Sequence, residues 1–399
     1  MRGGGLPTRG IVARLMVIAR PAGGQRGPRY SRAIATGVAG MSKQSRRSFI
    51  RSCLYLVLSG TGSSVAARLA FGRRNYNEKR PAAGKGTAAI DPDFEPPYLR
   101  LHRSGELKER GQTLWAIMEN CELCPRQCGV DRLDGDEGSC QASSQLEISS
   151  YHPHFGEERP LVGRGGSGTV FFANCGLRCV FCINWQISQG GEGSARSVAD
   201  LANMMLALQE RGCHNINIVT PTHYSPHVVL ALDLAAANGL RLPLVYNTCG
   251  WERVEILRLL DGIVDIYLPD YKYADGAMAA RYSSDARSYP GETQAALLEM
   301  HRQVGVAKPA ADGLMYRGLM IRHLVMPNDV GGTKRVLSWI AENLPKDTYV
   351  NIMSQYRPTY KAFDYPDISR PITRDEYRQA VDWAREVGLT NLDIQGYRG

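Results

Sequence analysis

Three cysteines lie close together between positions 175 and 182, in the segment Cys-Gly-Leu-Arg-Cys-Val-Phe-Cys. The segment follows an apolar run at 169–172 that is typical of a β-strand. A cubane iron–sulfur cluster is normally held by four thiolates, so three thiolates would leave one iron without a protein ligand. An open metal position can bind a substrate or cofactor. The spacing of Cys175, Cys179 and Cys182 therefore favours an iron–sulfur cluster with one open iron.

Spacing alone leaves three other interpretations of these cysteines open. Zinc prefers paired Cys-x-x-Cys ligands and closes its coordination at four, so it is second to the open cluster. A disulfide between cysteines this close would strain the loop. Three buried thiols without a metal are the remaining alternative.

The pattern Cys-x-x-x-Cys-x-aromatic-Cys resembles the signature of the radical S-adenosylmethionine (SAM) enzymes, with Phe181 at the aromatic position. The longer string from Gly166 to Asn184 is similar to the subgroup related to pyruvate formate-lyase activating enzyme. The resemblance runs from about Cys121 to the C-terminus. It implies a 4Fe–4S cluster that binds SAM at its open iron, with Phe181 beside the cofactor.

In the mechanism that this resemblance implies, reduced cluster cleaves SAM to methionine and a 5′-deoxyadenosyl radical, which abstracts a hydrogen atom from a substrate. A reductant such as flavodoxin or ferredoxin is implied as a partner. The sequence does not name the substrate. One hypothesis is an activase that installs a radical on a glycine of another protein, and another is an enzyme acting on a small molecule. The alternative to both is a non-catalytic exported iron–sulfur protein for electron transfer or partner binding.

A second group of cysteines precedes the first, with the spacing Cys-x2-Cys-x3-Cys-x11-Cys. Four thiolates close a metal site, so this group is expected to be structural or electron-carrying. A second 4Fe–4S cluster, a zinc ion and a disulfide-paired module are the three alternatives, in that order. The four residues are Cys121, Cys124, Cys128 and Cys140.

Strand and helix patterns alternate from residue 169 to residue 353. This alternation predicts a parallel sheet with helices outside it. Six units indicate a partial, open barrel, which the resembled family also has. The predicted fold class is therefore α/β, a partial (β/α)6 radical SAM barrel with an N-terminal Cys-rich module. The predicted strands span 169–172, 215–219, 242–246, 263–268, 319–325 and 349–353.

Polar residues gather at the carboxyl ends of these strands, where β/α barrels place their chemistry. By resemblance to the activating enzymes, Asp270 and Lys272 match an Asp-x-Lys pair near the SAM ribose and carboxylate. Arg322 matches an arginine that contacts the nucleoside. Asn247 and Thr248 lie where that group has an Asp-Thr pair beside the methionine moiety.

One position departs from the resembled family. The stretch 220–222, Thr-Pro-Thr, stands where the family usually has a Gly-Gly-Glu sequence that binds the methionine amine. Thr222 is the candidate contact at this place. His223 and His323 could be ligands or proton donors, and Cys249 a hydrogen-atom donor, although a structural role is commoner for such residues.

The net charge of +9 comes from the N-terminal part of the chain. Residues 1–77 contain 14 Lys and Arg and no Asp or Glu, which leaves 34 basic and 39 acidic residues, a net charge of −5, in the remainder. This distribution argues against nucleic acid as a partner. The hydrophobic content of 43% is that of an ordinary globular protein.

The acid-free leader contains a twin-arginine pair, Arg46-Arg47, followed by an apolar run and small residues near Ala67. This resembles a twin-arginine export signal, with Met41 as an alternative start. It predicts a periplasmic or membrane-attached protein, or a cytoplasmic one if the leader is not used. The predicted division is a leader at 1–72, a linker at 73–115, the Cys-rich module at 116–150 and the barrel at 151–399.

Overall fold

A computed structural model describes residues 94–397 of the chain. The predicted leader, with its twin-arginine pair, its cleavage point and the alternative start, lies outside the described residues. Part of the predicted linker lies outside them too.

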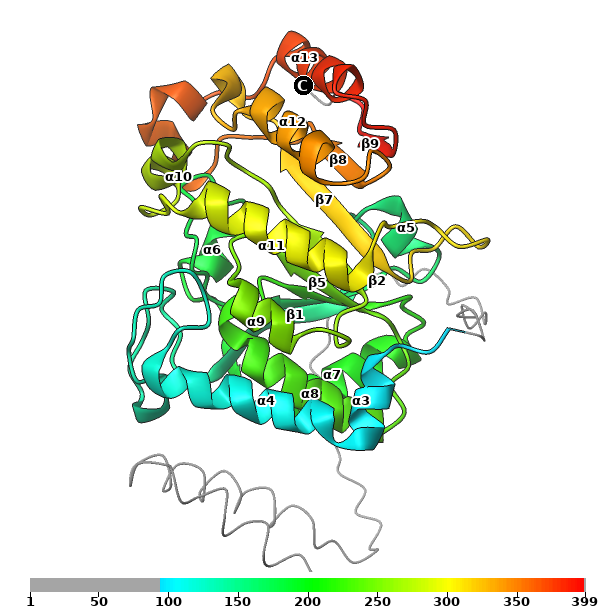
Figure 1. Cartoon of the computed structure of the whole chain (residues 1–399). Coiled ribbons are helices and arrows are strands. Elements are labelled where there is room, and N and C mark those ends of the chain that lie inside the picture. The colour runs from blue at the N-terminus through cyan, green and yellow to red at the C-terminus, as the bar shows by residue number, and fades with distance from the viewer. Residues whose placement is uncertain (1–93, 398–399) are drawn as a thin grey trace, which may run out of the picture. The chain divides into compact units, whose positions relative to one another are not determined.

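The described part is built on a nine-stranded sheet with the order β3-β1-β2-β4-β5-β6-β7-β8-β9 (Figure 1). From β2 to β9, each strand is parallel to its neighbour, whereas β1 is antiparallel to both β2 and β3. The strands are β1 Leu146–His154, β2 Ser167–Phe172, β3 Ser194–Arg196, β4 Ile216–Val219, β5 Leu244–Thr248, β6 Ile266–Pro269, β7 Gly318–Leu324, β8 Tyr349–Met353 and β9 Leu392–Ile394.

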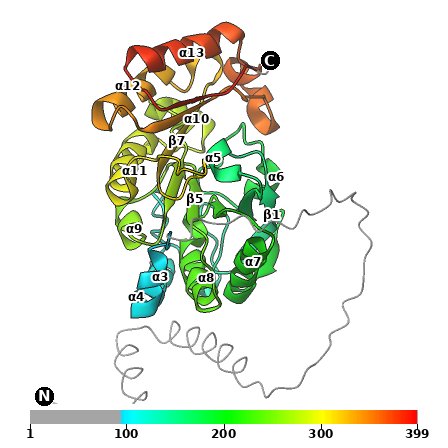
Figure 2. The same ribbon diagram turned by 90° about the vertical axis from the view of Figure 1, so that its right-hand side faces the viewer.

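Helices connect the parallel strands and follow one another around the outside of the sheet (Figure 1 and Figure 2). Within residues 94–397, no helix is both long enough and apolar enough to cross a membrane. The α-helices are α3 Tyr98–Ser104, α4 Glu106–Ala116, α5 Arg159–Val162, α6 Trp185–Ser188, α7 Val198–Glu210, α8 Ser225–Ala237, α9 Val254–Leu259, α10 Gly276–Tyr282, α11 Tyr289–Val304, α12 Thr333–Asn343 and α13 Arg374–Glu386.

The predicted α/β fold and its six parallel strands are confirmed, each strand within a few residues of its predicted bounds. The sheet ends at β3 on one side and at β9 on the other, so it is an open, partial barrel. Strands β1, β3 and β9 were not predicted. The sequence of β1 contains Pro153 and several polar residues, and β3 and β9 have only three residues each, too few to show a period. Strand β1 also crosses the predicted domain boundary between residues 150 and 151.

The two faces of the sheet have separate apolar cores because side chains alternate along each strand. On the outer face, Tyr246, Tyr267 and Ile321 pack with the helices. On the inner face, a smaller cluster joins Leu161 of α5 to strand residues. The strand residues of this inner cluster are Val245, Ile266, Leu268, Met320 and Tyr349.

The segment 98–116 forms the helices α3 and α4, so the prediction of a linker over 73–115 is wrong for this stretch. Leu107 and Leu114 are fully buried. Helix α4 packs along α8 so closely that a Cβ at Gly111 would lie 2.8 Å from the Leu230 side chain. Charged residues between these apolar positions gave the sequence a polar appearance, although the apolar ones recur at helical spacing.

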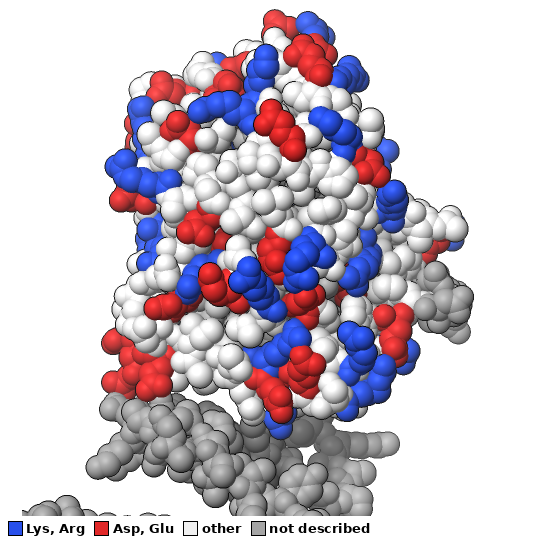
Figure 3. All heavy atoms as spheres, viewed as in Figure 1, with Lys and Arg blue, Asp and Glu red and all other residues white. Residues whose placement is uncertain are grey.

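Acidic and basic side chains are interspersed on the face that Figure 3 shows. Ion pairs between exposed partners include Arg302 with Asp261 at 2.7 Å and Arg103 with Glu95 at 2.8 Å. Such pairs contribute little to stability individually, because both charges stay hydrated.

The packing of α4 can be tested by replacing Leu114 with alanine. The substitution removes a fully buried side chain, so we expect the free energy of unfolding to fall by roughly 2–5 kcal/mol. Lys108→Ala, an exposed position on the same helix, should change it by less than about 0.5 kcal/mol. Urea denaturation of both variants measures the difference. Equal, negligible effects would mean that α4 does not pack as described.

Candidate active site at the carboxyl edge of the sheet

A row of polar side chains lies directly above the inner apolar cluster. Asn247, Asp270, Arg322 and Asn351 each follow an inner-cluster residue by two positions, namely Val245, Leu268, Met320 and Tyr349. Since side chains two residues apart in an extended segment lie on the same face, these polar residues line the concave side of the open barrel near its carboxyl edge.

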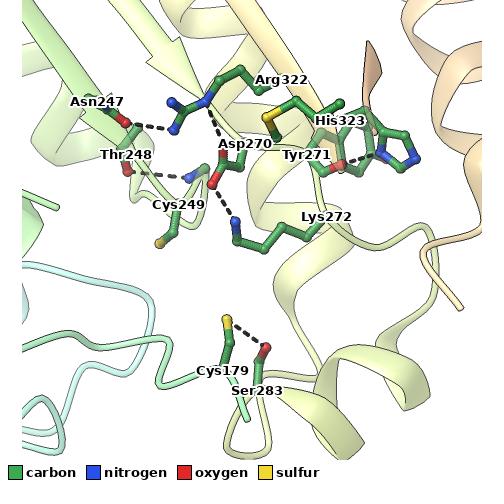
Figure 4. A network of polar contacts seen from close by, with 12 residues as sticks. Cys179, Asn247, Thr248, Cys249, Asp270, Tyr271, Lys272, Ser283, Arg322 and His323 are labelled. Carbon is green, nitrogen blue, oxygen red and sulfur yellow. Dashed lines mark hydrogen bonds and ion pairs between the residues drawn. The ribbon is translucent and has the colours of Figure 1, made fainter. Parts of the chain in front are cut away.

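Four of the predicted site residues meet in one network (Figure 4). Arg322 donates from Nε to Asp270 Oδ1 and from Nη2 to Asn247 Oδ1, both at 2.7 Å. Lys272 Nζ donates to the other carboxylate oxygen, Asp270 Oδ2. Gly250 brings the β5 loop against this centre, because a Cβ there would lie 2.0 Å from the Asp270 carbonyl oxygen. The network therefore joins the ends of β5, β6 and β7.

The carboxylate of Asp270 balances two largely buried cations, Lys272 and Arg322. Burial alone would raise the pKa of Asp270, but Arg322 and Lys272 outweigh burial and hold that pKa below its ordinary value. Burial alone would lower the pKa of Lys272, but Asp270 and, next, Cys179 more than offset this and raise it. Asp270 and Lys272 are therefore both ionised at neutral pH. Lys272 also lies close enough to Cys179 to oppose the effect of burial, which raises the pKa of that thiol.

The loop that carries the three clustered cysteines follows β2 and is fixed by contacts with distant segments. Val180 N donates to Tyr282 O at 2.9 Å, and Lys361 N donates to Val180 O at 3.0 Å. The Gln189 side chain donates to Cys179 O at 2.8 Å. These bonds hold the loop from the residue after α6, from α10 and from the segment after β8.

The donor set of this loop fits an iron–sulfur cluster. Burial raises the pKa of Cys175 and raises that of Cys179 to about 12, so a positively charged metal centre is needed to keep them as thiolates. Ser283 Oγ donates to Cys179 Sγ at 3.2 Å, and Ser188 Oγ lies 3.2 Å from Cys182 Sγ. Hydrogen bonds to the sulfurs are among the means by which proteins adjust such clusters.

Among residues 94–397, no three His, Cys, Asp or Glu side chains are arranged so that they could hold a metal ion as they stand. A cubane cluster does not need its thiolates in such close array, because each one binds a different iron. In Figure 4, the sulfur of Cys249 points toward the side on which Cys179 lies, and Lys272, whose amino group bonds to Asp270, lies between Asp270 and Cys179. The loop thus faces the polar network of Asp270.

The side chain of Phe181, which belongs to the cysteine loop, is buried in the core. Its ring packs against Tyr356 at a centroid distance of 5.8 Å and against Tyr273 at 6.4 Å. It is 5% exposed, so it supports the loop from below. A direct contact between Phe181 and a cofactor stays a prediction.

Thr222 and Thr248 do not join the network of Asp270. Both hydroxyl groups donate to the same carboxylate oxygen, Glu252 Oε1, with a distance of 2.6 Å from Thr222. Glu252 is fully buried, and burial raises its pKa to about 7 against the opposing effect of the two threonines. Thr248 follows Tyr246, a residue of the outer core, by two positions, so alternation places it on the outer face. Sequence reasoning missed Glu252, which stands in a loop without a recognised motif.

The two histidines near the site are buried, and the lone cysteine, Cys249, is partly buried. His323 bonds through Nδ1 to Tyr271 O at 2.7 Å and through Nε2 to Thr333 Oγ1 at 2.9 Å, which satisfies both ring nitrogens. His223 Nε2 bonds to Ala173 O at 2.8 Å, and burial lowers its pKa to about 3. Both rings therefore have structural bonds. Burial also raises the pKa of Cys249.

Two glutamates that the sequence analysis did not single out lie beside the network. Glu157 and Glu158 stand between β1 and α5. Glu157 Oε2 lies 3.6 Å from Arg322 Nη1, and Asn351 Nδ2 donates to Glu158 Oε1 at 2.8 Å. They come from a loop before the predicted barrel strands, so no strand-end rule could have found them.

The second group of cysteines gathers beside the first loop. A Cβ at Gly138 would lie 3.2 Å from Cys128 Sγ and 3.5 Å from Cys140 Sγ. A Cβ at Gly176, inside the first loop, would lie 3.7 Å from Cys124 Sγ. The module around residues 121–140 is therefore in contact with the cysteine loop of the barrel.

The charge balance of the network can be tested with Asp270→Asn. It leaves Lys272 and Arg322 buried without their shared counter-charge, so we expect a loss of roughly 3–5 kcal/mol in unfolding free energy at pH 7. The ionised form of Asp270 stabilises the fold fully above its unfolded pKa of about 3.9, and this contribution disappears as the pH falls through the lowered pKa of the folded state. The difference between wild type and variant should therefore shrink below about pH 4.

Urea midpoints measured across this pH range check the prediction. Asp285→Asn, at an exposed ion pair with Arg287, serves as the control and should cost about 0–1 kcal/mol. A loss for Asp270→Asn no larger than that of the control would contradict the network.

Comparison with known proteins agrees with this arrangement. The family described as the radical SAM superfamily matches residues 169–275, which include the cysteine loop, Asn247 and Asp270. An uncharacterized protein of Methanocaldococcus jannaschii is 32% identical over 288 residues, which cover 70% of this chain and 77% of that protein.

A solved structure described as a radical SAM methyltransferase from Sphaerobacter thermophilus is similar with a TM-score of 0.40 and 13% identity. The similarity covers 78% of this chain and 96% of that one. Together, the family match, the relative and the three thiols at the carboxyl edge of a parallel sheet identify the chain as a member of the radical SAM superfamily.

Proposed function

We propose that this protein cleaves SAM reductively at a 4Fe–4S cluster held by Cys175, Cys179 and Cys182, and abstracts a hydrogen atom from a substrate in the open barrel. The observation that carries the proposal is that the cysteine loop faces the network of Asp270, with Cys175 and Cys179 within electrostatic reach of Lys272. Family membership implies the cluster and SAM.

The bound cluster and SAM would supply an electron and a 5′-deoxyadenosyl radical that takes a hydrogen atom, while the protein binds, orients and shields. Cys175 and Cys179 are 9% and 8% exposed, so their loop can keep water from the reacting groups. The hydroxyl groups of Ser188 and Ser283 orient two of the sulfurs.

For SAM itself, we propose Asn247, Asp270, Lys272 and Arg322 as the binding residues. They offer amide, carboxylate and two cationic groups at one edge, a combination that suits hydroxyl and carboxylate groups of a ligand. Because Arg322 and Lys272 already hold Asp270 in place, the site is organised before the ligand arrives.

Thr222 and Thr248 have a different proposed role. Both hold Glu252, which ties the loop after β4 to the loop after β5. We therefore propose that they position the edge of the site and that direct contact with the cofactor falls to Asn247. The activase reaction on a protein glycine, and flavodoxin or ferredoxin as the reductant, stay predictions.

We further propose a metal–thiolate centre at Cys121, Cys124, Cys128 and Cys140. The support is Arg132, which is fully buried and which bonds to carbonyl oxygens of Ser143 and His223 and lies 3.8 Å from Cys121 Sγ. Within residues 94–397, no Asp or Glu forms an ion pair with Arg132. A buried cation without a counter-charge is unfavourable, and four metal-bound thiolates would supply negative charge where the thiols cannot.

The place of this second centre suggests that it carries electrons. Arg126 Nε donates to Gly176 O at 2.9 Å, inside the first cysteine loop, and Arg178 of that loop donates to Ser139 O at 3.4 Å. We favour a second 4Fe–4S cluster over zinc, because only an iron–sulfur cluster can use this contact to pass an electron to the first.

One prediction from the proposed function concerns the cleavage of SAM. Anaerobically reconstituted full-length chain, given SAM and dithionite, should release 5′-deoxyadenosine, and Cys175→Ala should lower its rate at least about 100-fold because one iron loses its protein ligand. Cys213→Ala, a buried cysteine in the turn after α7, is the control and should keep the rate within about twofold. An intact cluster that releases no 5′-deoxyadenosine would leave only the non-catalytic alternative.

Another prediction from the proposed function concerns the iron content of the chain. Full-length chain should bind about eight iron atoms, and a variant with both Cys124→Ala and Cys128→Ala should bind about four. Elemental analysis and electron paramagnetic resonance of reduced samples would check this. About four iron atoms and one zinc in the wild type would contradict the second cluster while leaving the first in place.

A further inference from the structure

The concave side of the barrel contains an excess of carboxyl groups beside the proposed SAM site. Glu157, Glu158 and Asp270 face two cationic groups, Arg322 and Lys272. Asp270 already uses both cations at close range, and Arg322 reaches Glu157 only at 3.6 Å. Glu158 has no ion-pair partner among the described residues.

Two oxygen atoms at this place have no hydrogen-bond donor. Glu158 is 6% exposed, and its Oε1 accepts from Asn351 while its Oε2 has no partner. Asn351 is 1% exposed, and its Oδ1 also has no partner. Buried acceptor atoms normally have a hydrogen-bond donor. Glu158 and Asn351 are bonded to each other and each has an acceptor without a donor, which indicates that a donor is missing here.

The charges of Glu157 and Glu158 also favour a positively charged donor at this place. Burial raises the pKa of Glu157, Arg322 partly offsets this effect, and both the charge of the neighbouring Glu158 and a side-chain hydrogen bond with it raise the pKa further. Two carboxyl groups so close need either a shared proton or a cation between them. A protonated amine supplies both the positive charge and the N–H donors that Glu158 Oε2 and Asn351 Oδ1 lack.

We propose that Glu157, Glu158 and Asn351 bind a protonated amino group of the substrate, so that the enzyme acts on an amine-bearing molecule. This inference rests on the proposed function. Because Glu157 lies beside Arg322, the bound amine would lie next to the SAM site, and the carbon that loses its hydrogen atom would lie close to that amine. A neutral hydroxyl in place of the amine would leave the acidic pair without a counter-charge.

SAM also carries a protonated amine, so the experiment must separate the two sources. The full-length, cluster-loaded chain is titrated with butylamine at pH 7.5 without any reductant, and isothermal calorimetry measures the affinity in the presence and absence of saturating SAM. 1-Butanol serves as the neutral probe of similar size. We expect butylamine to bind at least about tenfold more tightly than 1-butanol, with or without SAM.

The variants Glu158→Gln and Asn351→Leu should each weaken butylamine binding at least about tenfold, because each removes an acceptor. Glu386→Gln, an exposed acid near the end of α13, is the matched control and should leave binding unchanged. Thermal midpoints of all variants show whether they fold. If Glu158→Gln does not fold, Glu157→Gln provides a second test of the same acidic pair.

Three results would overturn the proposal. They are equal binding of 1-butanol and butylamine, no loss in the glutamate and asparagine variants, and complete displacement of butylamine by SAM, which would assign the acidic pair to the amine of SAM. Because no reductant is present, failure here differs from failure of the proposed function, which would appear as absent 5′-deoxyadenosine release in the separate cleavage assay.

Discussion

The ion pairs of Asp270 with Arg322 and Lys272 are the interaction on which the site depends. Taking three charges out of water is expensive, and only their mutual arrangement offsets that expense. Because the partners come from the ends of β6 and β7 and the loop after β6, the network also holds these strand ends in register. Asn247 extends it to β5 through Arg322. The same charges that would bind a ligand therefore fix the strands that present it.

Much of the fold could be predicted from the sequence because buried parallel strands are short apolar runs with helical patterns between them. Thus the strands around Val245, Leu268 and Ile321 were found, whereas β9, with three residues, was not. Helix α4 was missed because charged residues separate Leu107 from Leu114 and give the stretch the composition of a linker. Composition describes the exposed side of such a helix, and its packing depends on α8, more than a hundred residues later.

The candidate site could be predicted only in part, and alternation along the strands explains why. Polar residues at a strand end look equivalent in a sequence, yet neighbours face opposite sides. Arg322 lines the concave face while His323, the next residue, is bonded on the outer face. Asn247 and Thr248 separate in the same way. Arg322 and Asn247 stand two positions after Met320 and Val245, which belong to the inner cluster. This spacing assigns Arg322 and Asn247 to the concave face and their neighbours His323 and Thr248 to the outer face. No such count reaches Glu157 or Glu158, because they lie in a loop.

The contact between the N-terminal cysteine module and the barrel has a consequence for biosynthesis. Arg126 bonds to Gly176, 50 residues later, and to Ser284, 158 residues later, while Glu122 is held by Arg253, 131 residues later. When the four N-terminal thiols leave the ribosome, the segments that will enclose them do not yet exist. The contacts of this module can form only after the chain has been translated as far as Ser284. The metal centre proposed for this module would accordingly be completed late in the maturation of the chain.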